Sequence, residues 1–239
     1  MKAMSFNILA DRRTWRDRRS GIVDIILDLD ADIVGLQEAL DTQRAYLETA
    51  LSNDYELIEF NISGNYDNPI LLKNNRFMIL DQGTVLGSIC GGFDRYITWL
   101  LLFDNETEEE FYFYNNHICF TPESTKENHA IQLAQLIDLH QSGSSNCTAI
   151  AVGDFNARIN TSVMRYLLNQ VPINGISNPV NLDDTWDITN PNVNRPSTTE
   201  RGASIDWIIT LSGTNVTDAF VGDSNGYSDH YPLTATFNL

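Results

Sequence analysis

Residues 149–156 read Ala149-Ile150-Ala151-Val152-Gly153-Asp154-Phe155-Asn156. A short apolar run that ends at a glycine predicts a buried strand, here over residues 149–152. The acid and the amide that follow would lie at the carboxyl end of this strand, where the edge of a sheet can carry a site. On their own, Asp154 and Asn156 would be an ordinary turn. The stretch therefore predicts a buried central strand with two candidate functional side chains at its end.

The rest of the chain alternates segments typical of strands with segments typical of helices. Helical spacing of apolar residues predicts helices at 16–29, 41–51, 123–140 and 162–169. Apolar and β-branched runs predict strands at 3–9, 32–36, 55–60, 69–72, 76–80, 95–103, 111–116, 205–211 and 233–237. Turn residues fill 61–68 and 104–110, and the polar segment 171–202 is predicted to be a long loop. The two halves follow a similar order, which favours an α/β fold of two packed sheets with helices outside.

Length and composition predict a folded protein. The chain has 239 residues, 42 % of them hydrophobic and 20 % charged, so it can bury a sizeable core. We expect a single domain over residues 1–239 and a monomer. No apolar run approaches the ~20 residues that a membrane helix needs. The amino terminus lacks the apolar stretch of a signal peptide, so we expect a cytoplasmic protein unless an export segment is missing from this sequence.

The formal net charge of -17 argues against a protein that grips nucleic acid through a broad basic face. It does not exclude a nuclease, because bound cations can reverse the local field at a site. The three cysteines, Cys90, Cys119 and Cys147, have no metal-type spacing, and an odd number predicts no disulfide framework. We expect each of them to be a small buried hydrophobic residue.

Six short segments place a polar or charged residue at the end of an apolar run or inside one. They are Ser5-Phe6-Asn7, Leu36-Gln37-Glu38, Asn115-Asn116-His117, Gly153-Asp154-Phe155-Asn156, Ile205-Asp206-Trp207 and Ser228-Asp229-His230. Burying one unpaired polar group costs roughly 2–7 kcal/mol, and the cost falls if such groups converge on each other and on a metal ion. Carboxylates and amide oxygens suit Mg²⁺ or Mn²⁺, whose usual substrates are phosphate esters. No Ser–His or Cys–His nucleophile motif is present, which favours an activated water.

Each of these residues also has a purely structural interpretation. Asn7 could be a strand-end turn residue, and Glu38 could stabilise the start of the helix that follows. His117 could be a structural histidine, and Asp206 could pair with a nearby arginine such as Arg201. No single segment is strong evidence. The functional interpretation depends on the joint presence of all six in this order.

The ordered set resembles the endonuclease/exonuclease/phosphatase superfamily, which includes deoxyribonuclease I, exonuclease III, the deadenylases, neutral sphingomyelinases and inositol polyphosphate 5-phosphatases. The similarity extends over residues 4–237, and it is most specific at Gly153-Asp154-Phe155-Asn156 and at Ser228-Asp229-His230-Tyr231-Pro232-Leu233. It implies a four-layer α/β sandwich of the deoxyribonuclease I type, two packed mixed β-sheets flanked by helices. It also implies a Mg²⁺ or Mn²⁺ ion, held mainly by Glu38, with Asn7 orienting that carboxylate or helping to bind the ion and Asp229 on the metal side.

The resemblance implies catalytic roles at the other matching positions. Asp154 would position or deprotonate the attacking water, and Asn156 would hold this water and a phosphate oxygen. His230 and His117 would contact the scissile phosphate. Asp206 would accept a hydrogen bond from His230 and set its tautomer.

Arg95-Tyr96-Ile97-Thr98-Trp99 is similar to a strand of many bacterial members, and a guanidinium group suits phosphate, so Arg95 is a candidate phosphate clamp. Its alternative is surface pairing with an acid. The chain departs from several subgroups at residues 65–69, at His117-Ile118-Cys119 and at His129, where an arginine is frequent. We therefore expect a metal-dependent phosphoesterase with a small soluble substrate. A nuclease is the alternative, and a non-catalytic phospholigand-binding relative is the second alternative.

Overall fold

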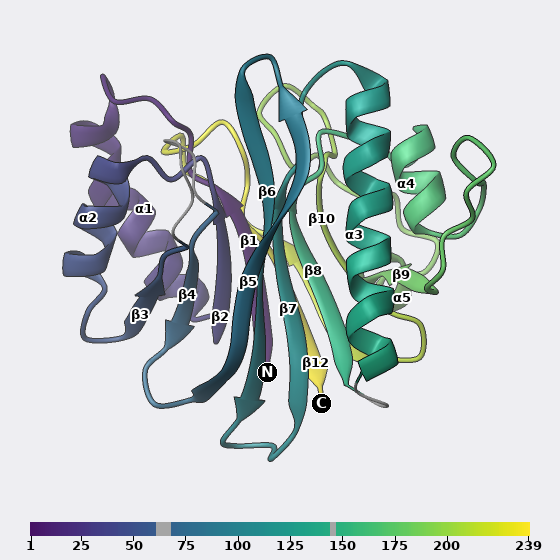
Figure 1. Cartoon of the computed structure of the whole chain (residues 1–239). Coiled ribbons are helices and arrows are strands. Elements are labelled where there is room, and N and C mark those ends of the chain that lie inside the picture. Colours follow the sequence, from purple (N-terminus) through teal and green to yellow (C-terminus); the bar gives the residue numbers. More distant parts are fainter. Residues whose placement is uncertain (61–67, 144–146) are drawn as a thin grey trace.

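The computed structural model describes residues 1–60, 68–143 and 147–239, and it contains two six-stranded mixed sheets (Figure 1). The first sheet has the order β11 (Asn215–Val221), β12 (Leu233–Asn238), β1 (Lys2–Asn7), β2 (Ile33–Gln37), β4 (Ile70–Lys73) and β3 (Tyr55–Ile58). The second has the order β5 (Phe77–Cys90), β6 (Phe93–Asp104), β7 (Glu110–His117), β8 (Thr148–Asp154), β10 (Asp206–Leu211) and β9 (Leu182–Asp184).

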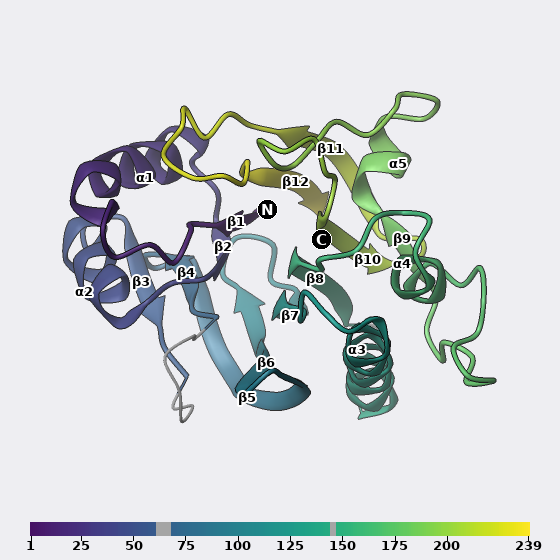
Figure 2. The same ribbon diagram turned by 90° about the horizontal axis from the view of Figure 1, so that it is seen from above.

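Helices cover the outer faces of the two sheets. These are α1 (Trp15–Leu29) and α2 (Asp41–Ala50) over the first sheet, and α3 (Glu123–Gly143) and α4 (Ser162–Leu167) over the second, as Figure 2 shows from above. The short helix α5 (Thr185–Thr189) follows β9. Three buried apolar clusters fill the space under α1 and α2, the space between the sheets, and the space under α3 and α4. This arrangement confirms the predicted four-layer α/β sandwich.

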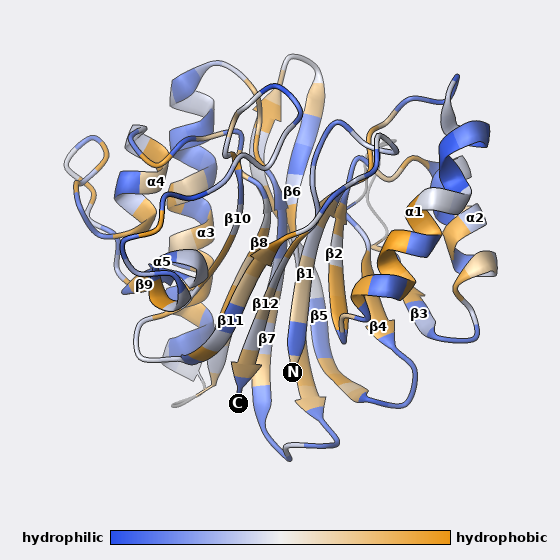
Figure 3. Ribbon diagram, turned by 180° about the vertical axis from the view of Figure 1, so that it is seen from behind, coloured by the Kyte–Doolittle hydropathy of each residue, from blue (hydrophilic) through white to orange (hydrophobic). Residues whose placement is uncertain are grey.

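Hydrophobic residues are concentrated in the sheets, where many strands are buried on both faces (Figure 3). Strand β8 lies between β7, which is parallel to it, and β10, which is antiparallel, and it is buried along almost its whole length because its alternate residues pack into the apolar clusters on the two faces of the sheet. Polar contacts also cross between the sheets. Gln37 Nε2 donates to Asn115 Oδ1 at 2.7 Å, and Asn115 Nδ2 donates to the Leu36 carbonyl at 2.9 Å. These buried hydrogen bonds fix the two sheets relative to one another close to the site.

Strand register brings several predicted site residues to the same edge. Asp154 pairs with His117 on one side and with Asp206 on the other. In the first sheet, Asn7 pairs with Gln37, the residue before Glu38. Gly153 allows the close approach of β7, because a Cβ atom there would lie 2.0 Å from the Asn116 carbonyl oxygen.

The structure corrects the predicted elements at three places. Strand β5 runs to Cys90, whereas the predicted strand ended at residue 80. The prediction stopped short because the rest of this edge strand is largely exposed and lacks a continuous apolar pattern. The segment 171–202 contains β9 and α5 as well as loops, and the edge strand β11 was not predicted. Of the predicted turn at 61–68, residues 61–67 lie outside the described residues. No helix in the described part of the chain is long and apolar enough to cross a membrane.

The prediction about the cysteines was wrong for two of the three. Cys90 and Cys119 form a disulfide, whereas Cys147 lies outside the disulfide and is buried as expected. The pairing arises because the end of the long strand β5 lies beside the loop that follows β7. Neither the odd number of cysteines nor the separation of 29 residues indicates this neighbourhood. The disulfide joins the β5–β6 hairpin to the segment two residues beyond His117.

Candidate active site

The carboxylates of Glu38 and Asp154 come from different sheets and share one amide group. Asn7 Nδ2 donates to Glu38 Oε1 at 3.2 Å and to Asp154 Oδ2 at 3.1 Å. The orientation of the Asn7 amide is fixed because its Oδ1 accepts a hydrogen bond from the Leu9 backbone N–H at 3.1 Å. The second Glu38 oxygen, Oε2, accepts from the Ala10 backbone N–H at 2.7 Å. Asn7 therefore links the two carboxylates across the gap between the sheets.

Two predicted site residues, Glu38 and Asn156, have an unusual backbone conformation that sets the direction of their side chains. Glu38 follows directly after β2 and has φ of 60°, and Asn156 has φ of 48°. A positive φ is costly for a residue such as glutamate and tends to persist where function or packing requires it. The loop after β1 is held by the buried guanidinium of Arg18, which donates to the carbonyls of Ile8 and Tyr227. Arg18 thus ties the loop that carries Ala10 to the loop that precedes His230.

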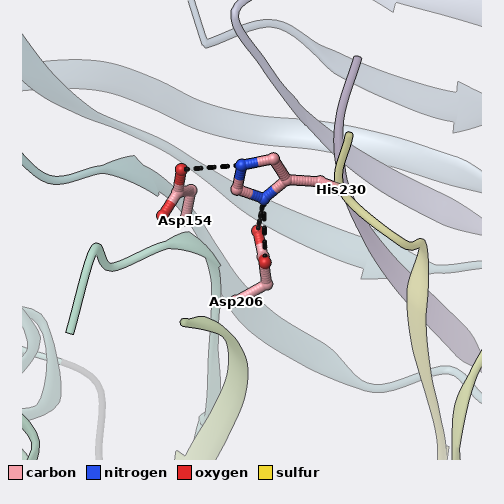
Figure 4. A group of neighbouring side chains, drawn as sticks. All are labelled: Asp154, Asp206 and His230. Atoms are coloured by element: carbon pink, nitrogen blue, oxygen red, sulfur yellow. Dashed lines mark hydrogen bonds and ion pairs between the residues drawn. The ribbon is translucent and has the colours of Figure 1, made fainter. Parts of the chain in front are cut away.

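His230 is clamped between two carboxylates, as Figure 4 shows. Its Nδ1 lies 3.0 and 2.9 Å from the two carboxylate oxygens of Asp206, and its Nε2 lies 3.8 Å from Asp154 Oδ2. The predicted hydrogen bond between Asp206 and His230 is therefore present. Thr198 completes the arrangement by donating from Oγ1 to Asp206 Oδ2 at 2.6 Å. The sequence gives no signal for Thr198, because it lies in the segment predicted to be a loop.

The surroundings of His230 and Asp154 give these two residues different pKa values. Burial by itself lowers the pKa of His230, but attraction and hydrogen bonding to Asp206, with smaller effects of Asp154 and Asp229, raise this pKa to about 10. His230 is thus a cation at neutral pH. The pKa of Asp154 is raised to about 7, first by burial and then by the charge of Asp206, while His230 opposes the rise. A carboxylate with a pKa near neutrality is suited to accepting a proton during a reaction.

His117 approaches the same carboxylates from β7. Its Nε2 lies 3.7 Å from Asp154 Oδ2 and 3.9 Å from Glu38 Oε1. Arg95 Nη1 lies 2.9 Å from His117 Nδ1, and because arginine can only donate, His117 is the neutral tautomer with its proton on Nε2. Burial first, and then the charge of Arg95, lower the pKa of His117 well below its usual value. Arg95 thus contacts His117, and its role as a phosphate clamp stays a prediction.

Two further predicted residues lie at the rim. Asn156 donates two hydrogen bonds, from its backbone N–H to Asp154 Oδ1 at 2.9 Å and from its Nδ2 to the Ile118 carbonyl at 3.0 Å. Asp229 is half-buried, and its charge contributes to the raised pKa of His230. All the predicted residues thus lie at one edge of the paired sheets. The sequence did not indicate the residues that position them, Arg18, Thr198 and Lys126, whose ammonium group donates to the Asn156 carbonyl at 3.2 Å.

The donor set fits a divalent cation. Asp154, Asp206 and His230 each offer a ligand atom, and these atoms lie within 4.8 Å of one another. Asp206 and His230 are already paired, however, whereas the Glu38 carboxylate is 25 % exposed and adjoins Asp154 through Asn7. Burial first, and then the charges of Asp206 and Glu38, raise the pKa of Asp154, against the opposing effect of His230. Oxygen ligands beside an excess of negative charge are what Mg²⁺ and Mn²⁺ bind in proteins.

Two packed mixed sheets with acids, amides and histidines at one edge define an α/β sandwich of the deoxyribonuclease I type. The sequence profile of the Endonuclease/Exonuclease/phosphatase family matches residues 4–230, and the chain belongs to this family. Members of the family are hydrolases that act on phosphoesters. No curated protein matches the sequence significantly.

Solved structures share the fold at low sequence identity. An endonuclease/exonuclease/phosphatase from Bacteroides vulgatus superposes with a TM-score of 0.84 at 20 % identity, covering 100 % of this chain and 98 % of that one. A mannosyl-6-phosphatase from Bacteroides thetaiotaomicron gives 0.79 at 18 % identity, covering 100 % of both chains. The human Nocturnin catalytic domain, solved with a bound sulfate anion, gives 0.81 at 21 % identity, covering 100 % of this chain and 93 % of that one.

Proposed function

We propose that the protein is a divalent-metal-dependent phosphoesterase that hydrolyses a small soluble phosphoester by in-line attack of water. The observation that carries the proposal is the convergence on Asp154 Oδ2, where Asn7 Nδ2, His117 Nε2 and His230 Nε2 lie at 3.1, 3.7 and 3.8 Å. A proton acceptor surrounded by donors and a cation is the arrangement that phosphoryl transfer needs, because its catalysis depends on positioning and charge stabilisation.

The roles of the side chains follow from their environments. Asp154 accepts a proton from the attacking water, whose oxygen bonds to phosphorus as the bond from phosphorus to the ester oxygen breaks. The leaving alkoxide takes a proton from water and departs as the alcohol, and Asp154 returns its proton to the solvent. The His230 cation and the Nε2–H of His117 face the phosphate oxygens, where negative charge develops. Asp206 holds His230 in its orientation and stabilises its charge.

Glu38 would hold the divalent ion, with Asn7 orienting its carboxylate and Asp229 on the same side. Such an ion supplies Lewis-acid stabilisation of the phosphate charge. Asn156 would hold a phosphate oxygen and the water, a role supported by the hydrogen bond from its backbone N–H to Asp154. Arg95 acts through His117 by fixing the tautomer that presents a proton at Nε2.

A small substrate is favoured over nucleic acid by the net charge of -17, since phosphate neutralisation dominates nucleic-acid binding. The phosphatase among the structures of the same fold, which its name describes as acting on a mannosyl 6-phosphate, is consistent with this choice. A nuclease remains the second candidate.

A substrate panel tests the proposal. Hydrolysis should be measured with Mg²⁺ and with Mn²⁺, as phosphate release from sugar phosphates, nucleotides and inositol phosphates and as cleavage products from sphingomyelin, plasmid DNA and RNA. We expect turnover of a small soluble phosphoester and little cleavage of the polymers. Oligonucleotide binding by the chelated protein should be no tighter than the non-specific range of ~10⁻⁴ M at physiological salt. Micromolar binding together with polymer cleavage would favour the nuclease instead.

A further inference from the structure

A cavity of about 600 Å³ lies beside the catalytic edge, on the outer side of strand β10. It is bounded by the loop that follows Asn156, by helix α5 and by the loop that leads into Asp206. None of the residues assigned to the reaction lines it. Two of its lining residues are close to them in the chain, because Arg158 is two residues after Asn156 and Ser204 is two residues before Asp206. Two residues span at most ~7 Å, so the cavity adjoins the site.

Arg195 forms a rigid wall of this cavity. Its side chain is 10 % exposed, pairs with the Asp184 carboxylate, and donates from Nη2 to the Asp206 carbonyl at 2.9 Å. Its guanidinium lies over the Trp207 ring, 3.9 Å from the ring centre. These contacts use both Nη groups and leave Nε, which is buried and has no hydrogen-bond partner in the described part of the chain. Ser204 Oγ is also buried and has no hydrogen-bond partner among the described residues.

Unpartnered buried polar atoms are uncommon in folded proteins and call for a water or a ligand. Arg195 Nε–H can only donate, so the group that satisfies it must accept a hydrogen bond. The Asp187 carboxylate, which also lines the cavity, can only accept, so a ligand that contacts both residues must also donate. A hydroxyl group does both. Asn160 and Asn194, also in the lining, offer further donors and acceptors of the same kind.

The charge and the apolar surface of the cavity narrow the ligand further. The lining has two arginines, Arg158 and Arg195, and two acids, Asp184 and Asp187, so its formal charges cancel. A substrate that carries a second anionic group, in addition to its phosphate, is therefore not favoured in this cavity. Ile159 and Val193 are exposed at 45 % and 57 % and provide apolar surface for C–H groups. Cavities with apolar walls and a few convergent polar groups are typical ligand sites.

We propose that this cavity binds the uncharged, hydroxyl-rich alcohol part of the substrate, a sugar or a similar polyol, while the phosphate lies against His230 and His117. The proposal rests on the proposed function for the phosphate end. It names the chemical class of the alcohol. The residues that would select the substrate are Arg195, Ser204 and Asn160, none of which takes part in the chemical step.

Binding to the chelated protein tests the cavity without relying on turnover. The probes are glucose, mannose and myo-inositol, with sulfate as an anionic comparison, and binding is followed by ligand-observed NMR. The variants are Asn160→Trp, which fills the cavity from its exposed lining, and Ser204→Ala, which removes the unpartnered hydroxyl. Asn53→Trp, at an exposed position in the turn before β3, is the matched control.

We expect at least one neutral polyol to bind, with its Kd raised fivefold or more by Asn160→Trp and by Ser204→Ala but not by Asn53→Trp. Failure of every polyol to bind the wild-type protein, or an unchanged Kd in both cavity variants, would overturn the proposal. Cavity-dependent binding of sulfate alone would also overturn it. If polyols bind in the expected way and the phosphorylated forms of the same polyols are not hydrolysed with Mg²⁺ or Mn²⁺, the cavity is supported and the proposed function fails.

Discussion

Nδ1 of His230 lies 2.9 Å from Oδ2 of Asp206, while Nε2 of the same ring faces Asp154 at 3.8 Å. One imidazole thus connects a buried acid to the acid proposed to accept the proton. Because Asp206 raises the pKa of His230 and His230 offsets the buried charge of Asp206, each residue depends on the other.

The first prediction is that losses at these two positions do not add. The double variant Asp206→Asn, His230→Ala should have about the same kcat as His230→Ala alone, the behaviour of residues that act as a unit. The measurement is a double-mutant cycle on phosphate release. If the two losses multiply, Asp206 and His230 act independently, and Asp206 is a structural acid.

The second prediction is that Asp154 acts at the chemical step. Asp154→Ala should lower kcat by about 10²–10⁴-fold, the usual contribution of a general base, with a modest change in KM. Steady-state kinetics on the best substrate of the panel separates the two constants. Unchanged kcat with a large rise in KM would instead assign Asp154 to substrate binding.

The third prediction concerns the pH dependence of stability at His129, which lies on α3 behind the site. Its Nδ1 lies 3.2 Å from Ser88 Oγ, and its Nε2 lies 3.4 Å from Asn116 Oδ1. Burial first, and then the charge of Arg95, lower the pKa of His129 to about 3. Below pH 6.5 the unfolded chain therefore takes up a proton at this residue that the folded protein does not, so stability falls as pH falls.

The variant His129→Gln removes this effect. Its free energy of unfolding, relative to that of the wild type, should rise by about 2 kcal/mol between pH 7 and pH 5, because one full proton difference is worth about 1.4 kcal/mol per pH unit. Urea unfolding at both pH values measures this change, and the difference at pH 8 gives the packing loss alone. A relative stability that does not vary with pH would show that the pKa of His129 is the same in the folded protein as in the unfolded chain.

Much of the fold could be predicted from the sequence because the central strands are buried. Strand β8 has a continuous apolar run, and the six polar segments stand out because each interrupts or ends such a run. The edge strands β5 and β11 carry exposed polar residues along much of their length, so they lack this signal. The Cys90–Cys119 disulfide depends on where the end of β5 lies in space, which no local pattern encodes.

The candidate site could also be predicted only in part from the sequence. The segments that carry Asn7, Glu38, Asp154 and His230 could be identified because order along the chain and residue type are visible in the sequence. Two contacts could not be identified: that of Arg95 with His117, and the hydrogen bond from Thr198 to Asp206. Each is made by the tertiary structure, and no local sequence pattern marks it.

The dependence on Glu38 and on a divalent ion tests the central claim most directly. Phosphate release from the best substrate should be measured for the wild type and for Glu38→Gln, each with Mg²⁺, with Mn²⁺ and with a chelator, and circular dichroism should verify that the variant is folded. The substitution removes the charge that would hold the ion while keeping the size of the side chain. We predict turnover only in the wild type and only with an added ion. Full turnover by the chelated wild type, or by the folded Glu38→Gln variant, would contradict the account.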